Sequence, residues 1–146
     1  MTQKLDSNPQ LESLEAEVNV LMRCMRPIFR QQARELTEQT MTASLINGIT
    51  RTLYDIMEKH GITLESIDTV GPDLQPLFTG YIKSLTGHAE QMDEFEVYAV
   101  QHPFEMIDRA KGSPDPLTRV LALTIEYATA LQLSKQHALS SSISRR

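Results

Sequence analysis

The sequence predicts an all-α fold, a compact helical bundle of about five to seven helices around an apolar C-terminal helix. Two observations indicate this class. Apolar residues recur three and four positions apart along most of the 146 residues, which is the period of amphipathic helices. Only residues 94–97 alternate in the manner of a strand, and no second segment offers this one a partner.

The length is that of one domain with one hydrophobic core. We expect a flexible N-terminus over residues 1–8 and a single helical domain over 9–139. The serine-rich segment 140–146 is expected to form a disordered C-terminal tail.

The first helix is expected to begin at Pro9, because Ser7 and Asn8 provide capping residues and proline suits the first helical position. Pro27 must kink this helix or start a new one, since its ring collides with the carbonyl four residues back. The heptad seam of this helix predicts that the helix forms either one wall of the bundle or the contact surface of a homodimer. Its residues are Leu11, Leu14, Val18, Leu21, Met25 and Ile28.

Turn and cap signals divide the middle of the chain into further helices. The threonine-rich residues 37–42 predict a break. Gly61, between His60 and Ile62, is typical of a left-handed helix cap, and His60 meets the helix dipole favourably there. Residues 92–99 fit helical as well as strand spacing, and we expect a helix. The predicted helical segments are 41–57, 63–70, 74–85, 92–99 and 103–112.

The last helix is expected over residues 116–138, because Asp115 can cap it and Pro116 stands at its first position. Glu126 is the only charged residue between positions 120 and 134. A helix that is apolar on most sides is normally the buried centre of a bundle. We expect Glu126 to reach water along a polar stripe formed by Arg119, Glu126, Thr129 and Gln136.

The composition excludes several classes of protein. A lone Cys24 excludes a disulfide scaffold and a cysteine zinc site. No run of ~18 apolar residues occurs, and no apolar segment follows Met1, so we expect a cytoplasmic protein without a membrane partner. His-Glu-x-x-His, Glu-x-x-His and phosphate-loop patterns are absent from the sequence. We therefore expect no catalytic residues, no metal and no cofactor.

Two charged clusters are candidate binding sites for a partner. A basic stripe at helical spacing could bind an anionic surface or lie solvated beside the heptad seam: Arg23, Arg26, Arg30 and Arg34. An acidic patch could bind a basic partner or form a solvated helix face: Glu90, Asp93, Glu94 and Glu96. This patch lies in residues 62–109, where nine acidic and two basic residues account for the net charge of -5.

Three function classes follow from these features. The favoured hypothesis is a non-catalytic protein–protein interaction module, an acidic helical adaptor, inhibitor or chaperone that binds another protein and can self-associate through its first helix. The alternative is a DNA-binding transcriptional regulator, since residues 53–85 resemble the opening of a helix-turn-helix and the basic stripe could contact phosphates. The acidic charge of the segment disfavours nucleic acid. An enzyme built from dispersed residues is the third class.

Overall fold

The computed structural model describes residues 9–25, 42–63, 65 and 69–144, with side chains described as far as residue 135. Over these residues the protein is all-α, with six α-helices, one short 3-10 helix and no strand, which confirms the predicted class. The elements are α2 (Pro9–Cys24), α4 (Ala43–Lys59), α5 (Gln75–Leu85), η2 (Ala89–Gln91), α6 (Glu94–Gln101), α7 (Pro103–Lys111) and α8 (Pro116–Ser144).

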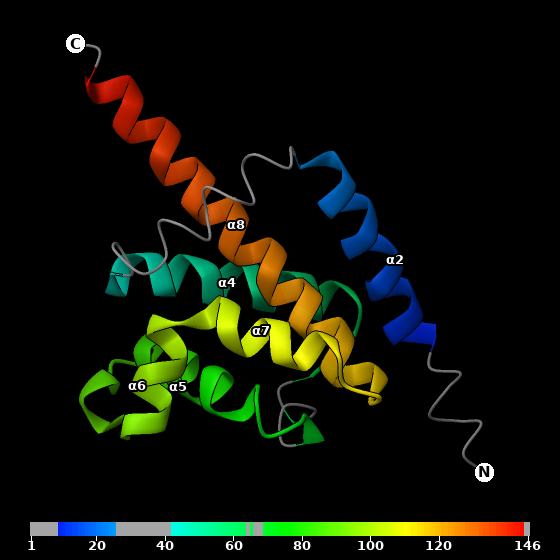
Figure 1. The fold of residues 1–146 in the computed structure, drawn as a ribbon. Coiled ribbons are helices and arrows are strands. Elements are labelled where there is room, and N and C mark those ends of the chain that lie inside the picture. Colours follow the sequence, from blue (N-terminus) through cyan, green and yellow to red (C-terminus); the bar gives the residue numbers. More distant parts are fainter. Residues whose placement is uncertain (1–8, 26–41, 64, 66–68, 145–146) are drawn as a thin grey trace.

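Helix α8 lies at the centre of the bundle, as its apolar circumference predicts (Figure 1). Helices α2, α4 and α7 pack directly against it. Helices α5 and α6 pack against each other and join the bundle through α4 and α7. Consecutive residues such as Leu121 and Ala122 are both fully buried in α8, because other helices cover it on several sides.

The helix starts and stops follow local sequence signals. Gly61 has a φ of 72°, and the backbone N–H of Ile62 donates to the Met57 carbonyl at 2.9 Å, which is the Schellman cap expected after α4. At the start of α8, the Asp115 carboxylate accepts from the Thr118 N–H at 3.1 Å. Residues 94–101 form a helix, so the ambiguity of this segment is resolved as expected.

Helix α8 ends at Ser144 rather than near residue 138. No glycine or proline follows Ala138 to stop the helix, so the backbone continues in helical form into the segment expected to be a disordered tail. The last turns of α8 project beyond the other helices (Figure 1). Pro27 and residues 1–8 and 37–41 lie outside the described residues, as do residues 64 and 66–68 of the short helix expected over 63–70.

Glu126 does not reach water along a polar stripe, and that expectation is wrong. Its exposed fraction is 5%, and its two carboxylate oxygens lie 3.2 and 3.3 Å from the Lys111 Nζ. The lysine reaches it from the C-terminal end of α7, which packs along α8. A buried carboxylate needs such a charged partner, because desolvation disfavours an isolated charge.

Candidate functional site

The heptad seam of α2 is used inside the protein. Leu14 and Val18 are fully buried, Leu11 and Met25 nearly so, and α2 packs against α8. Leu21 is partly exposed, and Ile28 lies outside the described residues. Since the bundle already covers most of the seam, α2 is a wall of the fold.

The basic stripe is described only at its first residue. Arg23 is exposed near the C-terminal end of α2, and no described carboxylate pairs with it. Arg26, Arg30 and Arg34 lie outside the described residues.

Two carboxylates of the acidic patch have a structural role, and the other two have no capping or ion-pair role among the described residues. Asp93 caps α6 by accepting from the Glu96 N–H at 2.9 Å, and the Glu96 carboxylate accepts from the Asp93 N–H, which completes a capping box. Glu96 is buried and pairs with the Lys83 Nζ at 2.7 Å. Glu90, Asp93 and Glu94 are exposed, but the Asp93 carboxylate is already engaged in the cap, so Glu90 and Glu94 are the members available to a partner.

The contacts of α5 bear on the helix-turn-helix hypothesis. Its only basic residue, Lys83, is bound to Glu96 and to the Gln91 carbonyl at 3.2 Å. The opposite face of α5 is buried, with Leu77, Phe78 and Tyr81 fully covered. Helix α5 therefore offers no free cation to the phosphates of DNA.

Helix α6 carries an exposed apolar surface that the sequence analysis does not single out. Phe95 is 70% exposed, and Val97 and Tyr98 are both more than two-fifths exposed. On the inner side of the same helix, Ala99 and Val100 are buried. Helix α6 is thus apolar on two opposite sides, and only one of them faces the core. The alternation at residues 94–97, unusual for an amphipathic helix, is the sequence signal of this arrangement.

A groove of about 610 Å³ adjoins this surface, and we call it the α6 groove. Three parts of the chain form it: the loop and first turn at the start of α5, the outer face of α6, and α7. Its apolar lining consists of Pro72, Pro76, Phe95, Tyr98 and Met106. Its charged lining consists of Asp73, Glu94, Glu105 and Arg109.

Tyr98 is held in place within the α6 groove. Its hydroxyl donates to the Glu105 carboxylate, with both oxygens within 2.9 Å, and its ring lies 4.5 Å from the His102 ring centroid. The loop at the start of α5 is also fixed, because the Gly71 N–H donates to the Thr118 hydroxyl at 2.9 Å. A groove whose walls are already ordered loses little conformational entropy when a partner binds.

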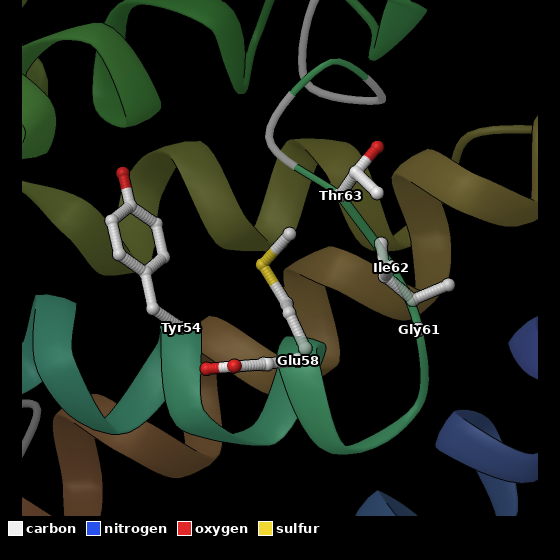
Figure 2. A pocket seen from close by; sticks show the side chains of 6 residues that line it. Tyr54, Glu58, Gly61, Ile62 and Thr63 are labelled. Carbon is white, nitrogen blue, oxygen red and sulfur yellow. The ribbon is translucent and has the colours of Figure 1, made fainter.

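A second, smaller cavity lies beside the C-terminal part of α4 (Figure 2). Its volume is about 330 Å³, and its lining is mostly apolar. The Tyr54 hydroxyl is buried without a hydrogen-bond partner, and burial raises the pKa of Tyr54 to about 12. The other polar groups of the lining are the Glu58 carboxylate and the Thr63 hydroxyl. They supply no pairing of nucleophile and base.

A serine, a histidine and a glutamate meet where α2 crosses the end of α4. The Ser13 Oγ lies 3.1 Å from the His60 Nδ1, and a Glu17 oxygen lies 3.3 Å from the His60 Nε2. Lys59 also binds Glu17 at 2.8 Å, and its hydrogen bond and charge hold the pKa of Glu17 below its ordinary value.

These residue types resemble those of an acyl-transfer relay, but the surroundings of Ser13 do not supply the oxyanion hole that such a relay also needs. An oxyanion hole needs free N–H donors beside the nucleophile. Ser13 lies inside α2, where backbone N–H groups bond within the helix. The cluster therefore serves to tie α2 to α4.

Two further features are absent from the described part of the chain. No group of three or more His, Cys, Asp or Glu side chains there could hold a metal ion. None of the helices, in the portion that is described, has the length and apolar character needed to cross a bilayer. Comparison with known proteins gives no match to any family model, curated protein or solved structure.

Proposed function

We propose that the protein is a non-catalytic protein-binding module, an adaptor, inhibitor or chaperone, that docks its partner on the outer face of α6 and in the α6 groove. The observation that carries this proposal is the exposure of Phe95, 70% of whose surface is open to water on a capped and well-packed helix. Aromatic side chains next to a groove are typical anchors of protein interfaces, because they bury a large area at little entropic cost.

The neighbours of Phe95 support the same proposal. Tyr98 lies one turn further along α6 and is ordered by Glu105, so two aromatic rings stand on the same face. Val97 is a further exposed apolar residue of α6, although it does not line the groove. Charged residues at the edge of the groove give the polar rim that surrounds the apolar centre of most interfaces.

The alternative, DNA binding through residues 53–85, receives less support. The basic residue of α5 is already paired, and the exposed carboxylates of α6 would repel phosphates. Self-association through the α2 seam is also less favoured, because α8 covers Leu14 and Val18. A second copy of the chain that docked on α6 would still be a form of the proposed interaction.

The test compares partner capture by three forms of the full-length protein: wild type, Phe95→Ala and Val20→Ala. Val20 is the matched control, since it is also an exposed apolar residue, 54% open, but lies on α2. We expect wild type and Val20→Ala to retain the same proteins from a lysate of the cells that make the chain, and Phe95→Ala to lose them.

Circular dichroism should show the same fold for all three forms, because neither substitution removes a buried side chain. Capture that is unchanged by Phe95→Ala would refute the proposed surface.

A further inference from the structure

The charges of the α6 groove indicate what kind of partner it takes. Three carboxylates line the groove, those of Asp73, Glu94 and Glu105, against the single guanidinium of Arg109. The side chains of Asp73 and Glu105 are 45% and 41% exposed, so both are accessible to a docking group. The groove therefore keeps an excess of negative charge after its internal pairing.

Arg109 shows that the groove accommodates a guanidinium. Its nitrogens lie 3.5 Å from Glu105 and 4.0 Å from Asp73, which are loose ion pairs. A carboxylate has about four acceptor positions, so these pairs leave acceptor positions for further donors. Glu94 has no ion-pair partner among the described residues.

The aromatic walls add a second attraction for a cation. The exposed face of Phe95 and the ring of Tyr98 border the same groove as the carboxylates. An arginine or lysine over such a ring gains a cation–π interaction while its aliphatic stem covers apolar surface. An anionic group would meet both the carboxylates and the negative faces of the rings.

We infer that the α6 groove binds a basic segment of a partner protein, with an arginine or lysine side chain between Phe95 and the carboxylates and with apolar residues on the outer face of α6. This inference rests on the proposed function and adds the chemistry of the partner. All residues that line the groove belong to segment 62–109, which carries nine acidic and two basic residues in the sequence, and this excess of negative charge favours the approach of a basic segment.

Fluorescence anisotropy with three labelled synthetic peptides tests the inference on the full chain. One peptide combines leucine and arginine at helical spacing, a second replaces every arginine with glutamate, and a third replaces every leucine with glycine. We expect the leucine–arginine peptide to bind at least tenfold more tightly than either of the others. Phe95→Ala should weaken its binding by roughly 30-fold, the loss typical of an interface hot spot.

Charge-neutralising variants separate the groove from general attraction to an acidic protein. Asp73→Asn/Glu94→Gln should weaken binding of the leucine–arginine peptide by roughly tenfold at low salt, with a smaller effect near 1 M salt. The matched control, Glu12→Gln/Asp55→Asn, removes two exposed carboxylates from α2 and α4. This control should bind as wild type does.

Four results would overturn the inference. Equal or tighter binding of the glutamate peptide, with the same dependence on Phe95, would leave the docking surface standing and refute the basic partner. An equal loss in the control pair would show non-specific attraction. A dimer in light scattering that Phe95→Ala dissociates would show that a second copy occupies the groove. Absence of any Phe95-dependent peptide binding would also refute the inference. The proposed function is tested separately by the capture experiment.

Discussion

Replacing Gly80 with alanine is expected to destabilise the protein, although alanine is the better helix former. A Cβ at this position of α5 would lie 2.6 Å from the Val100 Cγ1 and 3.3 Å from the Glu96 carbonyl oxygen. Carbon atoms normally pack at about 3.5–4.0 Å, so α6 must retreat by about 1 Å. Val100 is buried and β-branched, and it cannot rotate away easily.

The sign of the effect depends on two opposing magnitudes. Overpacking a core contact costs about 1–3 kcal/mol, and alanine gains about 1 kcal/mol over glycine in a helix interior. We expect a net loss of about 1 kcal/mol in the free energy of unfolding. Urea denaturation followed by circular dichroism measures this directly.

Gly48→Ala is the matched control, because it makes the same change inside α4. Its nearest contact is the Gln132 Oε1 at 3.0 Å, the end of a flexible side chain. We expect the free energy of unfolding of this variant to equal that of wild type or to exceed it by up to about 1 kcal/mol. A Gly80→Ala protein as stable as Gly48→Ala would refute the close approach of α5 and α6. Val100→Ala should cost less in the Gly80→Ala background than in wild type, because the added methyl group fills part of the space.

Three further predictions concern buried and paired polar groups. Lys111→Met leaves the carboxylate of Glu126 without its ammonium partner and should lower the free energy of unfolding, measured by urea denaturation, by about 2 kcal/mol. This loss is smaller than that of a fully buried pair, because the lysine side chain is 34% exposed. An unchanged free energy of unfolding would show that water solvates Glu126. The pKa of Glu17 lies below its ordinary value of 4.5, chiefly through its hydrogen bond from Lys59, so its contribution to stability is present above the ordinary value and is lost as pH falls through the lowered pKa. The stability difference between wild type and Glu17→Gln should therefore shrink in acid, and a constant difference would contradict the pairing. Burial raises the pKa of Tyr54 from 10.0 to about 12, so the contribution of the neutral hydroxyl to stability is full below pH 10 and is lost as pH rises toward 12. The Tyr54→Phe protein should therefore lose less stability than wild type over that range. An equal loss in the two proteins would place the Tyr54 hydroxyl in water.

The parts of the fold that the sequence predicts well depend on residues close together in the chain. The cap at Gly61 needs only the end of α4 and the two residues after it, and its bonds join Ile62 to Met57. The cap at Asp115 reaches only as far as Thr118. Apolar periodicity identifies α8 as the central helix for the same reason, because the pattern lies within one segment.

The parts that the sequence does not predict depend on contacts between distant segments. Glu126 is buried because Lys111 reaches it from another helix, and no spacing rule within α8 contains that information. Glu96 looks like a surface carboxylate until α5 brings Lys83 to within 2.7 Å. The Asp93-x-x-Glu96 pattern of a capping box was available in the sequence and would have removed two members of the acidic patch.

The α6 groove is harder to foresee than any single residue in it. Its lining comes from three segments, and its apolar part includes residues such as Met106 whose side chains are themselves largely buried. Phe95 fits the apolar spacing of a helix, yet the burial of Ala99 and Val100 turns it outward. Which side of a doubly apolar helix faces water is decided by packing against its neighbours.

The central position of α8 has a consequence for how the chain folds during synthesis. Helices α2 and α4 pack against a helix that begins only at Pro116, so neither finds that partner while the chain is still short. At ordinary rates of translation, the ribosome needs on the order of ten seconds to travel from the end of α2 to the start of α8. During that interval Leu14 and Val18 are open to water or to a holding factor, and the bundle closes only after α8 has emerged.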